Sequence, residues 1–321
     1  MERKKLWIYI LILCIGVMFC LSACLFSETD FVTFEEAQKL GGKIAAGGFR
    51  NMLVKSDGTV ICLGNNDVYD DMLDLNDVVA VAVGDYHNMV LKSDGKVICW
   101  GNNKYGQCDV PADLSDVVAI AAGWGHSMAL KSDGTVVCWG WNEDGQCDVP
   151  TGLNNEASVS FIVAGICHSM ALKADGTVVC WGDNVLGQCD VPAGLSDVVA
   201  VAAGVGHNIA LRSNGTVVCW GWNEFGQCNV PSRLRKVVAV AAGGNHNMVI
   251  KADGTIVCWG WNERGQCNVP EDLSDVVAIV AGHEHSMALK SDGTVVCWGD
   301  NEYGQCDVPE ELNLLNSTFA L

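Results

Sequence analysis

Short apolar segments alternate with polar turns along most of the chain. In one stretch, residues 117–123 (VVAIAAG) form an apolar, β-branched run, and residues 126–131 (HSMALK) form a second short segment. A Ser-Asp-Gly turn follows, and Asp-Gly between apolar runs is a strong hairpin signal because glycine adopts positive φ without strain. Residues 135–139 (TVVCW) predict a third strand, and the Gly-Gln-Cys stretch at 145–147 predicts a fourth. The pattern therefore predicts a four-stranded antiparallel unit.

This unit occurs seven times. The cysteine of the T-V-V-C-W-G segment recurs at spacings of 37, 39, 42, 39, 39 and 39 residues, at Cys62, Cys99, Cys138, Cys180, Cys219, Cys258 and Cys297. A period near 40 is typical of propellers and solenoids. Every side chain of TVVCW after the threonine is apolar, so neither face of that strand looks solvated, which fits a blade packed between two others. We predict an all-β fold, a seven-bladed β-propeller of four-stranded antiparallel blades, over residues 43–321.

The repeat G-x-x-H-[SN]-M-A-L-K-S-D-G-T-V-V-x-W-G-x-N-x-x-G-Q resembles the regulator of chromosome condensation repeat, a family of seven-bladed propellers, across residues 43–309. The G-Q-C-D-V-P join is similar to the secreted bacterial branch, which includes a propeller-type β-lactamase inhibitor protein. The chain departs from that pattern by its cysteines and by a degenerate first unit, where Leu63 replaces tryptophan and Gly-Gln-Cys is missing near Asp70 and Asp71. The nucleotide exchange and chromatin binding of eukaryotic relatives are not expected here, since fold analogy alone does not carry function.

Two features flank the repeats. Residues 312–321 occupy the place where an eighth first strand would begin, whereas the opening unit has only a shortened one at 43–47. The tail is therefore a candidate to close the ring. A short helix is expected at 33–40, within a linker at 24–42, because Thr33 and Glu36 have capping-box spacing.

The N-terminus predicts export. Basic residues at positions 3–5 precede an apolar run at 6–21, which is too short for a comfortable membrane span but suits a signal peptide. The run ends at Leu21-Ser22-Ala23-Cys24, which resembles a bacterial lipobox. We expect residues 1–23 to be cleaved and Cys24 to receive a lipid, with an ordinary signal peptide or an uncleaved anchor as the alternative. The predicted location is extracytoplasmic, at the cell surface or in the periplasm.

Charge and composition limit the classes of partner that the protein is expected to bind. The chain of 321 residues is 50% hydrophobic and carries a formal charge of −19. Because the leader contributes three basic residues and one acidic residue, the exported part carries −21. This charge opposes binding to nucleic acid, and the membrane would be reached through the lipid alone.

Cysteine is abundant, with 17 residues in the chain. Twelve of them fall into six pairs, always nine residues apart across a turn: Cys99/Cys108, Cys138/Cys147, Cys180/Cys189, Cys219/Cys228, Cys258/Cys267 and Cys297/Cys306. Opposed β positions lie within disulfide reach, and an exported protein meets a non-reducing environment. We expect disulfides, with small buried hydrophobes as the alternative. No metal site is expected, since an isolated pair rarely completes four zinc ligands.

Histidine and tryptophan recur in different ways. Six histidines occupy one equivalent position per unit, with Arg50 in the first, which indicates a repeated structural hydrogen bond rather than catalysis. Four tryptophans lie instead at positions that vary between units. Strand parity places the first-to-second and third-to-fourth loops on one face. That face would carry Tyr86, Tyr105, Trp124, Trp141, Trp222, Phe225, Trp261 and Tyr303. Exposed aromatics are typical anchors for protein partners or sugar rings, although they also pack on neighbouring blades.

These features predict a function without catalysis. No phosphate loop, nucleophile elbow or metalloprotease motif is present, and no cofactor is expected. We expect a lipid-anchored, non-enzymatic protein-binding or scaffold module that presents an aromatic face. The alternatives are a cell-wall or host glycan-binding protein, or an inhibitor of an exported enzyme such as a β-lactamase, a partner suggested by the family resemblance.

Overall fold

The computed structural model describes residues 43–65, 75–154, 159–309 and 312. All of them belong to the unit Phe31–Leu321, which is the part considered below. The predicted leader, Cys24, the linker and the helix at 33–40 lie outside the described residues. So does the predicted closing strand at 312–321, apart from Leu312.

The described residues form seven antiparallel sheets of three strands each, which we number blades 1 to 7 in chain order. The first strands are β1 (Ile44–Ala46), β4 (Val78–Val83), β7 (Val117–Ala122), β10 (Val159–Ala164), β13 (Val198–Ala203), β16 (Val237–Ala242) and β19 (Val276–Ala281). The middle strands are β2 (Arg50–Val54), β5 (His87–Lys92), β8 (His126–Lys131), β11 (His168–Lys173), β14 (His207–Arg212), β17 (His246–Lys251) and β20 (His285–Lys290). The outer strands are β3 (Val60–Gly64), β6 (Val97–Gly101), β9 (Val136–Gly140), β12 (Val178–Gly182), β15 (Val217–Gly221), β18 (Ile256–Gly260) and β21 (Val295–Gly299).

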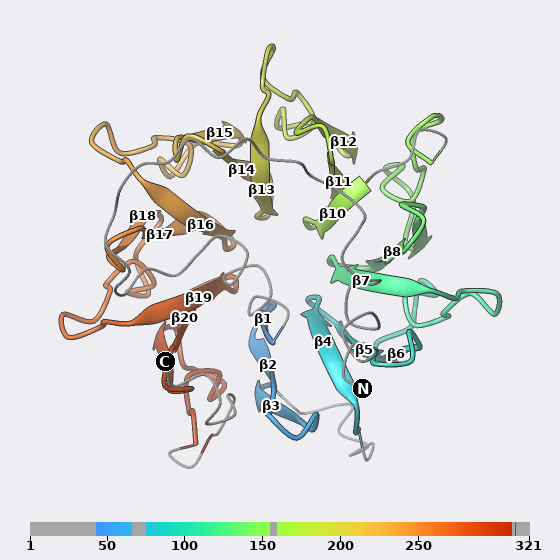
Figure 1. Cartoon of the computed structure of the whole chain (residues 1–321), viewed down its shortest axis with the longest axis horizontal. Coiled ribbons are helices and arrows are strands. Elements are labelled where there is room, and N and C mark those ends of the chain that lie inside the picture. Colours follow the sequence, from blue (N-terminus) through green and yellow to red (C-terminus); the bar gives the residue numbers. More distant parts are fainter. Residues whose placement is uncertain (1–42, 66–74, 155–158, 310–311, 313–321) are drawn as a thin grey trace, which may run out of the picture. The chain divides into compact units, whose positions relative to one another are not determined.

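The seven sheets surround a common axis, with the first strand of each sheet innermost (Figure 1). Each innermost strand contacts the innermost strand of the next blade, and β1 contacts β19. The ring is therefore closed within the described residues, by direct contact between blades 7 and 1. The prediction of an all-β, seven-bladed propeller is confirmed.

The hydrophobic core lies between blades. Met89 and Leu91 of blade 2 pack with Ala129 and Trp139 of blade 3 in one such cluster, and equivalent clusters fill the other interfaces. Most middle strands are buried at five consecutive positions, as expected for a sheet covered on both sides. Leu312 packs against the cluster shared by blades 7 and 1.

The predicted fourth strand is absent from the described sheets. The segment around Gly145-Gln146-Cys147 consists of turns, and so do the equivalent Gly-Gln-Cys segments of blades 2, 4, 5, 6 and 7. Gly145 has φ +77°, outside the β region, and the amide of Cys147 donates to the Asn142 side chain (2.7 Å) instead of to a neighbouring strand. Local side-chain hydrogen bonds thus satisfy the groups that a fourth strand would pair.

Candidate binding surface

A repeated hydrogen-bond relay links neighbouring blades at six of the seven interfaces, and blade 1 has Arg50 in place of the relay histidine. His126 of blade 3 contacts Ser169 of blade 4 (Nε2 to Oγ, 3.0 Å), and the Ser169 hydroxyl donates to the backbone carbonyl of Gln146 (2.8 Å). Trp181 Nε1 donates to the same carbonyl (3.0 Å). Because a hydroxyl has one hydrogen, Ser169 accepts from His126, which fixes the Nε2–H tautomer. Equivalent histidine contacts occur from His87, His168, His207, His246 and His285 to Ser127, Asn208, Asn247, Ser286 and Asn51.

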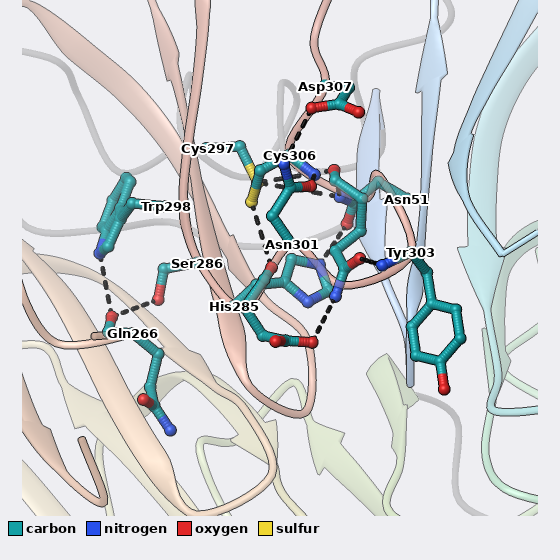
Figure 2. Close-up of a disulfide and its surroundings, with 12 residues drawn as sticks. Asn51, Gln266, His285, Ser286, Cys297, Trp298, Asn301, Tyr303, Cys306 and Asp307 are labelled. Carbon is teal, nitrogen blue, oxygen red and sulfur yellow. Dashed lines mark hydrogen bonds between the residues drawn. A yellow bond between two sulfur atoms is a disulfide. The ribbon is translucent and has the colours of Figure 1, made fainter. Parts of the chain in front are cut away.

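Figure 2 shows two of these interfaces. Ser286 and Trp298 converge on the Gln266 carbonyl, while His285 lies beside Asn51 of blade 1. Asn51 donates in turn to the carbonyl of Gln305 (2.7 Å), so the interface between blades 7 and 1 has the same histidine–asparagine–carbonyl contacts as those between blades 4 and 5 and between blades 5 and 6.

All six relay histidines are neutral. They are fully buried, and burial lowers the pKa of His126 to about 3 and that of His207 to about 4. Each is engaged by a neighbouring blade, so the set has a structural role, as the sequence predicted. Their Nδ1 atoms have no partner among the described residues.

The loops that follow the outer strands share one rigid frame. In blade 3, the Asn142 side chain accepts from the Cys147 amide and donates to Asp148 (2.8 Å), while Gln146 accepts from the Asp144 amide. The same Asn and Gln contacts recur in blades 2, 4, 5, 6 and 7. Residues between these framework positions are thus displayed on a preorganised loop.

Two sets of loops emerge at one end of each blade. The start of β8 pairs with the end of β9, His126 opposite Gly140, so the loop before β8 and the loop after β9 are adjacent. We define the aromatic face as these two sets: residues 47–49, 84–86, 123–125, 165–167, 204–206, 243–245 and 282–284, together with 102–106, 141–145, 183–187, 222–226, 261–265 and 300–304.

The predicted aromatic residues form three groups on this face. Trp124 is the hub of the first, with ring centroids 5.5 Å from Tyr86, 5.5 Å from Tyr105 and 5.1 Å from Trp141. In the second, Phe225 lies 5.3 Å from Trp222 and 6.1 Å from Trp261. Tyr86 and Phe225 are the most exposed rings of these two groups, at 49% and 43%. The four tryptophans are half-buried.

The third group contains residues that the sequence analysis missed. Tyr303 packs on Phe49 (5.2 Å), which also contacts the His283 ring (6.0 Å). Phe49 is 37% exposed and occupies the repeat position of Tyr86, so a stricter alignment of the degenerate first unit would have identified it. In Figure 2 the Tyr303 ring points away from the neighbouring disulfide.

An ion pair crosses the face above blade 1. His283 of blade 7 contacts Asp85 of blade 2 (Nε2 to Oδ1, 3.1 Å), and Arg50 of blade 1 donates to the Asp85 carbonyl (2.9 Å). Burial opposes protonation of His283, but the hydrogen bond and charge of Asp85, with a contribution from Glu284, raise its pKa above the ordinary value. Asp85 and His283 both lie at the position in the repeat that Trp124 occupies in blade 3.

A cavity of about 90 Å³ opens at the centre of the ring. One glycine from each blade lines it, together with Asp85, Trp124 and His283. The seven glycines are Gly47, Gly84, Gly123, Gly165, Gly204, Gly243 and Gly282. Glycine backbone therefore forms part of the wall of this opening, and the larger side chains of Asp85, Trp124 and His283 form another part.

The cysteine pairs bracket the loops of the aromatic face. Cys297 and Cys306 form a disulfide (Figure 2). Cys180 and Cys189 are thiols with their sulfur atoms 3.2 Å apart. The Cys99/Cys108, Cys138/Cys147, Cys219/Cys228 and Cys258/Cys267 pairs are also thiols in the structure, so their disulfides stay predictions. Cys167 is a further thiol, and burial raises its pKa to about 12.

Within the described part of the chain, no group of three or more metal-ligating side chains occurs. The same residues include no helix with the length and apolar character needed to cross a membrane.

Comparison with known proteins identifies the family. The model of the RCC1-like domain matches residues 28–318. No curated protein matches the chain.

Solved structures share the fold. The ectodomain of the receptor kinase CR4 from Physcomitrella patens is 25% identical with a TM-score of 0.68, over 80% of this chain and 73% of that one. The CRINKLY ectodomain of the Arabidopsis thaliana receptor kinase ACR4 is 24% identical with a TM-score of 0.64, over 80% and 95%. Prp20p from Saccharomyces cerevisiae is 21% identical with a TM-score of 0.62, over 75% and 77%. The match of the family model over residues 28–318 shows that the protein belongs to the RCC1-like domain family.

Proposed function

We propose that the protein is a non-enzymatic, extracytoplasmic binding or scaffold module that presents its aromatic face to a protein partner. The observation that carries this proposal is the gathering of eight predicted aromatic residues, plus Phe49, on the rigid loops of one end of the ring. Partly exposed aromatic clusters on preorganised loops supply large contact areas at low entropic cost. Prp20p, which has the same fold, has reported binding to Gsp1p and histones, so this architecture can serve protein recognition.

The chemistry of the relay supports a role without catalysis. Six of the seven histidines are buried, neutral and engaged by the next blade. The seventh, His283, is paired with Asp85. A general base needs access to substrate, which these arrangements do not give to the relay histidines.

The partner test uses site-specific photo-cross-linking in the native host. A photoreactive residue at Val185, which is 87% exposed on the aromatic face, is expected to cross-link to a discrete protein. The same residue at Asp133, in a hairpin turn at the other end of blade 3, is expected to give no such product. The W141A/W222A/W261A variant should lose the Val185 product. Equal products from both positions, or a product that survives the triple substitution, would contradict the proposal.

A glycan ligand predicts a different result. Exposed aromatic rings also stack on sugars. A glycan array that gives hits sensitive to W141A/W222A/W261A, without any protein cross-link at Val185, would favour glycan binding over protein binding. An exported enzyme such as a β-lactamase as the partner is the inhibitor alternative, and the identity of the cross-linked protein decides it.

The lipid anchor is proposed at Cys24. The supporting observation is the order of a basic head, an apolar run and Leu21-Ser22-Ala23-Cys24. Metabolic labelling with an alkyne fatty acid should mark the wild-type protein, and Cys24→Ser should abolish the label and release the propeller from the membrane fraction. Labelling that persists in the serine variant would contradict a lipid at this residue.

A further inference from the structure

The charge of the aromatic face is strongly one-sided. Its loops, as defined above, carry nine acidic residues and only two basic ones, besides His283. The acidic residues are Asp85, Glu143, Asp144, Asp183, Glu224, Glu263, Glu284, Asp300 and Glu302. Aromatic rings and carboxylates therefore share this surface.

Several carboxylates at the two ends of the ring differ in whether a basic side chain lies close to them. In the hairpin turns at the opposite end, lysines lie close to the aspartates: Lys173 to Asp175 at 3.4 Å, Lys251 to Asp253 at 2.8 Å and Lys290 to Asp292 at 3.6 Å. On the aromatic face, the exposed carboxylates Glu143, Asp144, Glu224, Glu263 and Glu302 form no ion pair with any described residue. Asp85, Glu284 and Asp300 of the aromatic face do have cationic partners, whereas these five carboxylates have none among the described residues.

These carboxylates recur beside aromatic rings in a fixed arrangement. Blades 3, 5 and 6 each have a Trp-Asn-Glu sequence, ending at Glu143, Glu224 and Glu263. In blade 7, Glu302 precedes Tyr303. The asparagine of each loop is held by the framework hydrogen bonds, so the four glutamates lie at equivalent positions, and in blades 3, 5 and 6 the tryptophan does as well.

The two basic side chains of the aromatic face each lie close to a ring or to a carboxylate of that face. Lys104 places its Nζ 5.1 Å from the centre of the Tyr105 ring. Arg264 contacts Glu284 (Nε to Oε2, 3.2 Å) and approaches Asp300 (Nη1 to Oδ1, 4.0 Å). Ring faces and carboxylates are the groups that recognise ammonium and guanidinium side chains.

We propose that the partner segment bound by the aromatic face is a basic polypeptide, with lysine and arginine side chains that stack on the rings and pair with Glu143, Glu224, Glu263 and Glu302. This inference rests on the proposed function, because it names the chemistry of the partner at the same surface. Charge complementarity supports it, since the whole chain carries −19 and a basic segment would be steered toward it.

The test compares matched variants and labelled decapeptides that alternate Arg with Ser, Glu with Ser, or Gln with Ser. Binding to the full chain in nonionic detergent is measured by fluorescence anisotropy at about 150 mM salt. We expect binding of the arginine peptide only. The E143Q/E224Q/E263Q/E302Q variant should raise its Kd about tenfold, which corresponds to about 1.4 kcal/mol. The control variant D133N/D175N/D253N/D292N makes the same change in charge at the opposite end, where Asn214 already occupies the equivalent turn position in blade 5. It should change the Kd less than about twofold.

Equal weakening by both variants would overturn the inference, because it would mean general attraction to an acidic protein. Equal affinity for the three peptides, or no binding of the arginine peptide, would overturn it as well. The proposed function fails separately, in the cross-linking experiment. If W141A/W222A/W261A abolishes the Val185 product but the four glutamine substitutions do not weaken it, the aromatic face is a binding surface for a partner that is not basic.

Discussion

Seven glycines at the ends of the innermost strands are required by contact rather than by backbone conformation. Gly123, for example, does not have the positive φ that favours glycine, but an added Cβ would overlap the His126 ring and the carbonyl of Gly165 in the next blade. Both obstacles are fixed parts of the ring, since His126 is held by Ser169. A methyl group at this position therefore has no flexible neighbour to displace.

Gly123→Ala should lower the free energy of unfolding by about 1–3 kcal/mol, the usual cost of overpacking. Urea denaturation followed by tryptophan fluorescence measures the change. Gly48→Ala is the matched control, because a Cβ at Gly48 meets its nearest neighbour, Asp85 Oδ1, at 3.4 Å. If both substitutions have the same effect, the contact argument is wrong.

The relay histidines make the fold sensitive to acid. Burial lowers the pKa values of His87, His207 and His285 to about 4 and those of His126 and His246 to about 3, while unfolded histidine titrates near 6.5. Protons therefore bind the unfolded chain first. The stability conferred by the neutral histidines is complete above pH 6.5 and is lost as the pH falls toward 4.

We expect the melting temperature to fall steadily from pH 6.5 to pH 4. Nitrogen-15 NMR of histidine-labelled protein checks the cause: at pH 5, His87, His126, His207, His246 and His285 should remain neutral with the proton on Nε2, while His283 should be protonated. Relay histidines that titrate near pH 6.5 in the folded protein would contradict this assignment.

The position of the relay histidines within the repeat was predictable from the sequence, but their hydrogen-bond partners were not. The equivalent position of six histidines predicted a structural hydrogen bond, which the structure shows. The acceptors lie about one repeat further along the chain, as in His168 and Asn208, and the relay ends on a backbone carbonyl, that of Gln188. A main-chain group leaves no mark in the amino-acid pattern, so the sequence could not identify it.

At the scale of the strand and the loop, hydrophobic pattern predicted three strands per blade and failed at the fourth. The Gly-Gln-Cys segment is short and follows an apolar strand, which resembles a hairpin in sequence. Its conformation is decided by Asn142 and Gln146, whose side chains bond amides within the same loop. Such local side-chain bonds compete with strand pairing, and hydrophobic periodicity does not register them.

The disulfide of blade 7 should stabilise the loop that carries Tyr303. Closing a loop of this length contributes about 2–3 kcal/mol in the chain-entropy account. C297S/C306S should therefore lower the free energy of unfolding by about that amount in the oxidised protein, and by much less when both proteins are kept in reductant. Non-reducing peptide mapping should recover the Cys297–Cys306 linkage, and Cys167→Ser serves as the unpaired control. No difference between oxidised wild type and the double variant would contradict a stabilising bridge.

At the scale of the whole molecule, the Asp85–His283 pair joins blades 2 and 7 across the short first blade. The two residues are separated by most of the propeller in sequence, so no local pattern could pair them. Because the pKa of His283 is raised in the fold, its contribution is complete below the unfolded value near 6.5 and is lost as the pH rises through the folded value.

His283→Asn should lower stability at pH 6 by about 1 kcal/mol or less, given the partial exposure of the pair. Near pH 9 the deficit of the variant should be smaller, since the imidazole is then neutral in both states and its charge no longer contributes. Denaturation curves at the two pH values measure this. Asp57→Asn, which removes an exposed pair in a hairpin turn, should show no such convergence. An equal deficit of His283→Asn at both pH values would contradict a contribution from the charge of His283.

The closed ring has a consequence for how the molecule unfolds. An open solenoid has two terminal repeats, each with a single neighbour, and can fray from either end. Here every described blade contacts two others, and histidine contacts join all neighbouring blades except 1 and 2, where Arg50 donates to the Asp85 carbonyl instead. Removing one blade breaks two interfaces at once and leaves buried polar groups without hydrogen-bond partners. Unfolding of any single blade therefore has a high cost in free energy. We expect the whole ring to unfold in one cooperative transition of all seven repeats.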